Sequence, residues 1–289
     1  MSGSIVSPIQ TYLTDSAGEA KFASAAALGN AQQTNLINYF TAQASKITTP
    51  AALLGNYKAL SVVLGAFGIG GLINSTALVK QLLTQDPGST SSVAYRIGNA
   101  KYLAFAKALQ SWTPPPFSSS SGINAIVDAY KKYNFEAAAG AQTPGLQQAL
   151  YFTRIAGSIT SLTQLQSDAD LMAVAVTGLG LPLTAFDNLS FEQQTALLKN
   201  KLTLTDLQKP AYVQHLAELY LVQQQLANGL STPTVQPGSL VALFSHTTAS
   251  SSANALFTIL QNAEPSSGGS TSLLGTASAA SKSLLSLFA

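Results

Sequence analysis

The chain of 289 residues contains no cysteine and few charged side chains. The lack of cysteine excludes disulfides, thiolate metal sites and cysteine nucleophiles. Only 9% of the residues are Asp, Glu, Lys or Arg, compared with about 25% in typical soluble domains. The 14 basic and 12 acidic residues leave a net charge of +2, which gives nucleic acid no long-range attraction. We therefore expect no nucleic-acid partner and a surface built mainly from uncharged polar side chains.

Long hydrophobic runs are also missing. The richest stretch, residues 60–73, is interrupted by glycines and is shorter than the run of about 18 apolar residues that a membrane-spanning helix needs. The first residues lack the basic segment and continuous apolar core of a secretory signal. The sequence therefore predicts a soluble chain with no transmembrane segment and no export through the Sec pathway.

Apolar residues make up 46% of the chain and recur mostly at intervals of three and four, which favours helices over strands. Residues 171–176 are rich in Val and Ala, but no second strand candidate lies nearby, so we assign them to a helix as well. The sequence predicts an all-α helical bundle. Its expected helices lie in residues 16–47 (one helix or a pair), 50–64, 76–85, 99–112, from 123 onward, 147–166 and from 171 onward.

Composition divides the chain into three parts. These are an N-terminal helical segment (1–48), a main helical domain (49–228) with a Pro- and Ser-rich loop at 113–122, and a Ser- and Pro-rich tail (229–289) whose only charged side chains are Glu264 and Lys282.

Two stretches of the main domain resemble each other, residues 57–112 and 170–220. Gly68 pairs with Gly180 at an offset of 112, and Tyr102 with Tyr212 at an offset of 110. Because the offsets differ, an internal duplication would require insertions. An internal duplication into two similar helical units and chance similarity are therefore both open alternatives.

The end of the tail carries apolar residues at intervals of 4-3-4-3, the spacing of a seam that docks along another helix. A short isolated helix is marginal in water, so we expect this one to form only against a partner. Two alternatives stay open, docking on another subunit and folding back onto its own domain. The predicted partner-binding residues are Leu273, Ala277, Ala280, Leu284, Leu285, Leu287 and Phe288.

The glycine-rich segments do not have the spacing of a nucleotide site. Gly68 and Gly70 lack the third glycine of a dinucleotide fingerprint and follow a predicted helix rather than a strand. We therefore expect Gly68, Gly180 and Pro182 to have structural roles where helices break. His215 and His246 are the only histidines and have no ligand partners at metal-binding spacing. The sequence predicts no catalytic set, no metal and no cofactor.

Arg154 is the most unusual charged residue, because it lies among Tyr151, Phe152 and Ile155. A guanidinium in such surroundings needs an anionic partner, and the candidates are Asp168, Asp170 and Glu136. We prefer a structural ion pair over a ligand-binding role. Asp168 and Asp170 are also expected to cap the helix that begins near residue 171.

Several segments together resemble a known family. They are Ala149–Arg154, Thr177–Pro182, Asp206–Pro210, Ala66–Ile69 and Tyr95–Tyr102, and the likeness extends over roughly residues 50–225. These segments resemble the DUF1217 family, bacterial proteins of no settled function that are often encoded among flagellar genes of alphaproteobacteria. Thr153 departs from the family pattern, which usually has an acidic residue there.

The resemblance implies a role in motility and implies no reaction. The resulting hypothesis is a non-enzymatic protein–protein interaction or assembly protein. Its partners would be flagellar components or further copies of itself, and it would be located at the flagellum, with the cytoplasm as the alternative. The second functional hypothesis is a small-ligand binding module at the junction of the two helical units, near Gly68, Arg154 and Gly180.

Overall fold

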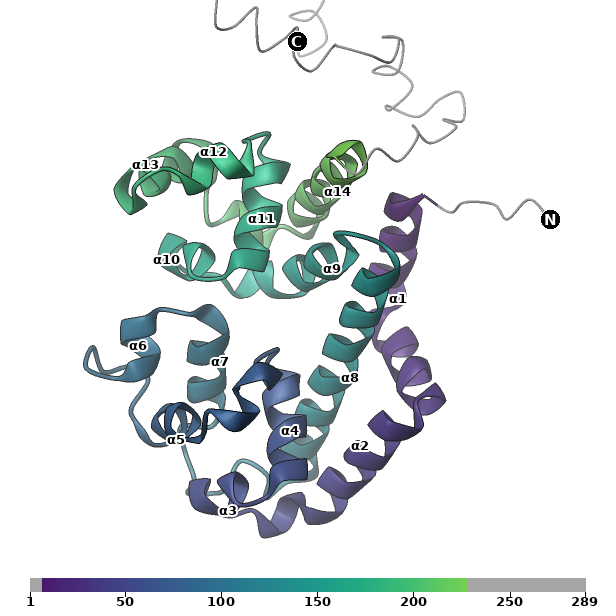
Figure 1. Ribbon diagram of the computed structural model, residues 1–289, viewed down its shortest axis with the longest axis vertical. Coiled ribbons are helices and arrows are strands. Elements are labelled where there is room, and N and C mark those ends of the chain that lie inside the picture. The colour runs from purple at the N-terminus through teal and green to yellow at the C-terminus, as the bar shows by residue number, and fades with distance from the viewer. Residues whose placement is uncertain (1–6, 228–289) are drawn as a thin grey trace, which may run out of the picture. The chain divides into compact units, whose positions relative to one another are not determined.

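The computed structural model describes residues 7–227, all of which belong to one compact unit (Figure 1). Within this range the chain forms helices and no strand, which confirms the all-α prediction. The α-helices are α1 (Pro8–Gly29), α2 (Ala31–Gln43), α3 (Pro50–Leu54), α4 (Tyr57–Ala66), α5 (Thr76–Thr84), α6 (Val93–Ile97), α7 (Ala100–Ala108), α8 (Ser120–Gln142), α9 (Leu146–Ile155), α10 (Leu162–Gln166), α11 (Ala169–Gly178), α12 (Leu183–Asp187), α13 (Phe191–Lys201) and α14 (Pro210–Ala227). Short 3₁₀ helices lie at Ala44–Lys46, Gly70–Asn74, Ala156–Ser158 and Asp206–Gln208.

Helix starts are set by local side-chain caps. Thr49 accepts a hydrogen bond from the Ala52 N–H and precedes Pro50 at the start of α3. Asn99 accepts bonds from the N–H groups of Lys101 and Tyr102 at the start of α7. Such caps satisfy backbone donors that have no partner within the helix, and both helix starts were expected from the sequence.

Two of the predicted continuous helices are interrupted, so these predictions were wrong. The helix expected over 50–64 breaks into α3 and α4, where Asn56 accepts a bond from the Ala59 N–H. The helix expected over 147–166 breaks into α9, a 3₁₀ turn and α10, where Ser161 accepts a bond from the Gln164 N–H. In both places a short polar side chain accepts a hydrogen bond from a backbone N–H in place of a backbone carbonyl, and a new helix starts there.

The loop predicted at 113–122 lies further toward the N-terminus, between Ala108 and Ser120, and is better anchored than expected. Helix α8 begins inside it, at Ser120, with Ser119 accepting a bond from the Gly122 N–H. Phe117 is 1% exposed and makes edge-to-face contacts with Phe40 and Trp112. The loop therefore contributes Phe117 to the core.

The buried side chains form two hydrophobic cores within this unit. One is built mainly from α9, α11 and α14, and it includes the fully buried Tyr12 of α1. The other is built mainly from α2, α4, α5 and α7. Helix α8 connects them, because it packs on α4 of the second core and on α9 of the first. The N-terminal segment is part of this arrangement, with α1 packed along α8 and Phe22 stacked on Phe135.

A structural repeat relates the two cores. Residues 39–69 and 151–181 align at a constant offset of 112 without a gap, and nine of the 31 positions are identical. The elements coincide as well: a 3₁₀ turn, a five-residue helix and a ten-residue helix recur at the same offset. Each copy ends with a left-handed glycine, Gly68 (φ +68°) or Gly180 (φ +73°), whose conformation closes the preceding helix.

The repeat therefore differs from the one expected. It begins upstream, at Tyr39 and Tyr151, and needs no insertion as far as Ile69 and Leu181. The pairing of Tyr102 with Tyr212 is not supported by the packing. Tyr102 lies on α7, which packs on α5 and α6, whereas Tyr212 lies on α14, which packs on α9 and α11. Helix α14 packs on α11 in the second copy, and α8 packs on α4 in the first.

In the described part of the chain, no helix combines the length and apolar character that crossing a membrane requires.

Candidate functional site

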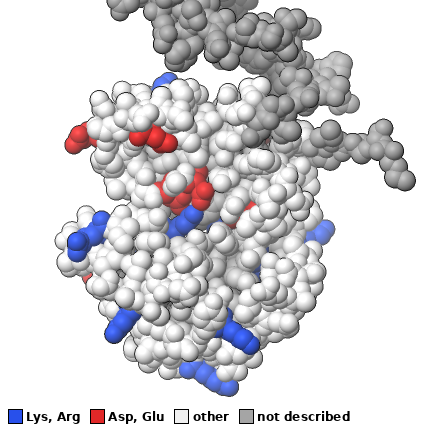
Figure 2. All heavy atoms as spheres, viewed as in Figure 1, with Lys and Arg blue, Asp and Glu red and all other residues white. Residues whose placement is uncertain are grey.

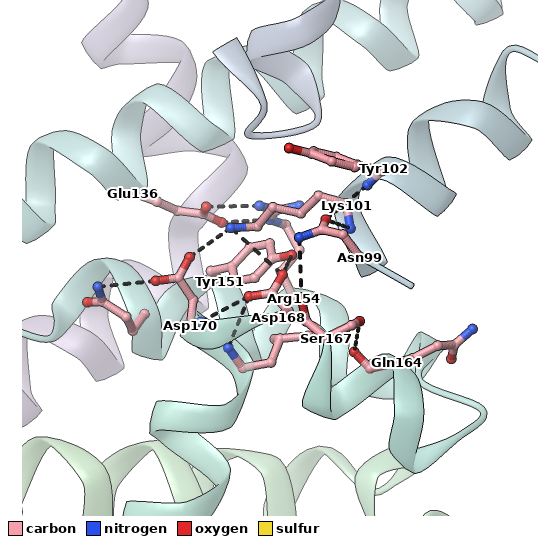
Figure 3. A network of polar contacts seen from close by, with 12 residues as sticks. Asn99, Lys101, Tyr102, Glu136, Tyr151, Arg154, Gln164, Ser167, Asp168 and Asp170 are labelled. Atoms are coloured by element: carbon pink, nitrogen blue, oxygen red, sulfur yellow. Dashed lines mark hydrogen bonds and ion pairs between the residues drawn. The ribbon is translucent and has the colours of Figure 1, made fainter. Parts of the chain in front are cut away.

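Charged side chains from five helices meet between the two cores. They come from α1, α7, α8, α9 and α11, and Figure 3 shows most of them around the ring of Tyr151. Figure 2 shows that most of the drawn face carries no charge, and that acidic and basic side chains lie together near its middle. In a chain with so few ionisable groups, this concentration marks the candidate site.

Arg154 on α9 forms a two-point ion pair with Glu136 on α8. Its Nε lies 2.6 Å from Glu136 Oε1, and its Nη2 lies 2.9 Å from Oε2. Glu136 is completely buried. Paired hydrogen bonds of this kind fix geometry as well as charge, so the pair locks α8 to α9. Glu136 was one of three partners that the sequence proposed, and the other two, Asp168 and Asp170, bind Lys101 instead.

A second carboxylate approaches Arg154 from α1. Glu19 Oε1 lies 3.9 Å from Arg154 Nε, and it accepts no hydrogen bond within residues 7–227. Burial and the neighbouring Glu136 carboxylate raise the pKa of Glu19 to about 7, against the opposing effect of Arg154 and Lys132. Two acidic groups thus share one guanidinium, and near neutral pH one of them is partly protonated.

Asp168 caps α11 and ties it to α9. Its Oδ1 accepts bonds from the N–H groups of Asp170 and Leu171, and its Oδ2 accepts a 2.8 Å bond from the Tyr151 hydroxyl. Only 2% of the residue is exposed. Burial and the Asp168 charge raise the pKa of Tyr151 far above its usual value, so this hydroxyl stays a hydrogen-bond donor. The capping role expected for Asp168 is confirmed.

Lys101 on α7 completes the cluster. Its Nζ lies 2.7 Å from Asp170 Oδ2, 3.7 Å from Asp168 Oδ2 and 4.7 Å from the centre of the Tyr151 ring. Burial alone lowers the pKa of Lys101, but the hydrogen bond to Asp170 and the charge of Asp168 outweigh this effect and raise it. Lys101 therefore stays charged and connects α7 to α11.

A cavity of about 320 Å³ lies beside this cluster. Helices α4, α7 and α8 line one side, and α9, α10 and α11 line the other. Most lining residues are apolar, and the charged ones are Lys101, Lys107 and Arg154. The cavity therefore combines an apolar wall with cationic groups.

The residues proposed for a junction site are only partly brought together. Arg154 lines the cavity, Gly68 lines a smaller neighbouring recess that shares Lys101, and Gly180 lines neither. Gly180 and Pro182 lie instead at the turn between α11 and α12. The predicted tail residues, from Leu273 to Phe288, lie outside the described range.

Two members of the cluster, Lys101 and Glu19, were not singled out from the sequence. Lys101 lies within a family-like segment, which is a signal that could have marked it, whereas no local pattern marks Glu19. Thr153, which departs from the family pattern, accepts a hydrogen bond from the buried Tyr12 hydroxyl while it donates to the Ala149 carbonyl. At this position, an uncharged hydrogen bond between Thr153 and Tyr12 thus connects α9 to α1.

On α8, Tyr130 is buried and packs against Gly65. His215 is exposed on α14. Among residues 7–227, no group of three or more His, Asp or Glu side chains has the arrangement of a metal site. Within this range the charged cluster acts chemically as a set of paired donors and acceptors that hold α7, α8, α9 and α11 together, with Glu19 of α1 beside them.

Replacing Glu19 with glutamine is expected to change how stability depends on pH. A carboxyl group with a raised folded-state pKa favours folding at low pH, and this contribution is lost as the pH rises from about 4.5 to about 7. Glu19→Gln should therefore be more stable than the wild type at pH 8, by up to about 3 kcal/mol, and similar to it at pH 5. Thermal unfolding across this pH range measures the difference. Glu192→Gln, on the exposed start of α13, is the control, and equal pH profiles for wild type and Glu19→Gln would contradict the assignment.

Comparison with known proteins identifies the fold. The crystal structure of protein AGR_C_984 from Agrobacterium tumefaciens is similar, with a TM-score of 0.69 and 20% sequence identity over 78% of this chain and 99% of that one. At this identity the similarity shows the fold alone. No curated protein matches the chain significantly. Residues 66–213, half of the chain, match the family model of DUF1217, described as a protein of unknown function. The chain therefore belongs to the DUF1217 family.

Proposed function

We propose that this protein is a non-enzymatic protein-binding component that acts in flagellar assembly, and that α14 provides one of its contact surfaces. The observation that carries the proposal is an exposed apolar pair on the last described helix. Leu219 is 38% exposed and Leu226 is 62% exposed. Residues seven apart project from the same face of a helix, so the two leucines form one stripe.

The opposite face of α14 is buried within the fold. Val213, Leu216, Ala217, Tyr220 and Leu221 are buried, and the helix packs on α9 and α11. Because Leu219 and Leu226 take no part in this packing, their side chains are free to contact another chain. Single exposed apolar residues are ordinary on protein surfaces, as with Leu28 and Tyr57 here, but a two-turn stripe has the spacing of a helix-docking face.

The nature of the partner rests on family membership, because proteins that resemble this one are often encoded among flagellar genes. The apolar seam that the sequence predicts in residues 273–288 would supply a second contact. The charged cluster around Arg154 agrees with a non-enzymatic role, because its side chains form ion pairs with one another and stabilise the domain.

The test is a double substitution on α14, Leu219→Glu with Leu226→Glu, introduced into the full chain in the native flagellated cell. We expect it to abolish recovery of flagellar proteins with the tagged chain and to impair motility, while circular dichroism and the melting temperature stay near wild type. The control, Ala211→Glu with Gln225→Glu, adds the same charge elsewhere on α14 and should retain the partners. Unchanged recovery with the leucine variant would contradict the contact surface, and recovery of no flagellar protein with the wild type would contradict the flagellar role.

A further inference from the structure

The cavity between the two cores has the composition of a binding site for a small amphipathic anion. Its walls include Phe67, Leu103, Ile155 and Ile159, which suit a hydrocarbon chain or ring. Its volume of about 320 Å³ falls at the lower end of the range of about 300 to 1,000 Å³ found for small-molecule sites. An apolar enclosure with a few convergent polar groups is the usual form of such a site.

The ionisable groups that line the cavity are cations and tyrosines. Lys101, Lys107 and Arg154 line it, while their acidic neighbours Asp170 and Glu136 are not among the lining residues. The carboxylates therefore lie behind the cations, so that the cationic side chains are the ones that face the cavity.

Within the part of the chain that the structure describes, two of these cations can still interact with a ligand, Arg154 through a free hydrogen-bond donor and Lys107 through its unpaired charge. Arg154 gives its Nε and Nη2 to Glu136, and its Nη1 has no acceptor among the described residues. Lys107 is exposed at the cavity and forms no ion pair within residues 7–227. The charges of Lys101 and Arg154 are already balanced, so only one positive charge, that of Lys107, is uncompensated. One negative charge would balance it, whereas a second would be desolvated without a partner.

We propose that this cavity binds a monocarboxylate with an apolar chain or ring, its carboxylate held by Lys107 and Arg154 Nη1 and its apolar part against Phe67 and Leu103. The site is independent of the α14 surface, since no residue of α14 lines the cavity. It would make the junction of the two cores sensitive to a metabolite, because the ligand would contact helices on both sides.

The test uses straight-chain carboxylates from butanoate to octanoate as probes of the full-length protein, with 1-octanol as the neutral control. Isothermal titration calorimetry should give one site per chain and weaker binding of 1-octanol than of octanoate. Each added methylene should raise the affinity by up to about fourfold until the cavity is filled.

Two variants locate the site without touching the buried ion pairs. Lys107→Gln should weaken octanoate binding about threefold, as expected for an exposed charge, and should leave 1-octanol binding unchanged. Lys80→Gln, at an exposed lysine on α5, should change neither. Ala104→Phe fills the cavity from α7 and should abolish binding, whereas Ala51→Phe on α3 should not. Circular dichroism verifies that each variant is folded.

Three results would overturn the proposal. They are no binding of octanoate at about 10 mM, far above the range of a specific site, equal affinities for octanoate and 1-octanol, or octanoate binding that neither Lys107→Gln nor Ala104→Phe weakens. None of these results bears on the α14 contact surface, so the two proposals fail separately.

Discussion

Replacing Arg154 with methionine is expected to lower the free energy of unfolding by about 3 to 5 kcal/mol, because it leaves the carboxylate of Glu136 buried without its partner. Glu136 is completely buried and takes both of its charged hydrogen bonds from Arg154. The Glu19 carboxylate would lose the same neighbouring charge. In a domain of this size the loss corresponds to a decrease in melting temperature of about 10 °C, measured by thermal or urea unfolding.

A double variant separates the loss of the pair from the loss of one partner. Arg154→Met combined with Glu136→Met removes both charges, and replacement of a buried pair by apolar groups is often nearly neutral. We therefore expect the double variant to be more stable than Arg154→Met alone. An unaltered melting temperature for Arg154→Met, together with loss of partner or ligand binding, would instead assign Arg154 to recognition.

Replacing Asp168 with alanine is expected to lower the free energy of unfolding by about 2 to 4 kcal/mol. The change removes the cap of α11, typically worth about 1 kcal/mol, and leaves the Tyr151 hydroxyl without its acceptor, at a cost of about 1 to 3 kcal/mol. Asp168→Asn should lose less, since an amide oxygen can still cap the helix. The measurement is chemical unfolding of the three proteins at pH 7.

The repeat provides a matched control for this change. Asn56 occupies the position equivalent to Asp168 and caps α4 through the Ala59 N–H, but it has no part in the charged cluster. Asn56→Ala should therefore cost only the cap, about 1 kcal/mol. If both alanine variants lose the same stability, the bonds of Asp168 to Tyr151 and Lys101 contribute nothing measurable.

The sequence predicted the helix starts that depend on neighbouring residues. The starts at Thr49 and Asn99 follow from capping side chains within three positions of the helix. The breaks after α3 and α9 were missed because the apolar spacing continues across them: Leu53, Leu60 and Leu64 are all buried although they lie on two helices. Tyr57 continues the same spacing in the sequence, but it is 64% exposed at the start of α4.

The ion-pair partner of Arg154 could not be predicted from the local sequence alone. A guanidinium among apolar residues predicts an acidic partner, and three candidates were named. The choice among them depends on which helices lie side by side, since Glu136 is 18 residues away on α8. Lys101 reaches Asp170 across 69 residues, and no periodicity in the sequence encodes that approach. The identity of the ion pairs therefore required the structure.

The gapless repeat also allows the charged cluster to be compared with an equivalent segment that lacks it. Arg154, Asp168 and Asp170 correspond in the first copy to Ala42, Asn56 and Lys58, whereas the buried Phe152, Ile159 and Leu165 correspond to the identical and equally buried Phe40, Ile47 and Leu53. These buried hydrophobic residues are thus the same in both copies, whereas none of the three charged positions carries the same residue in the first copy. Residues 39–69 are therefore an internal reference for residues 151–181, because they form the same helices without the charged cluster.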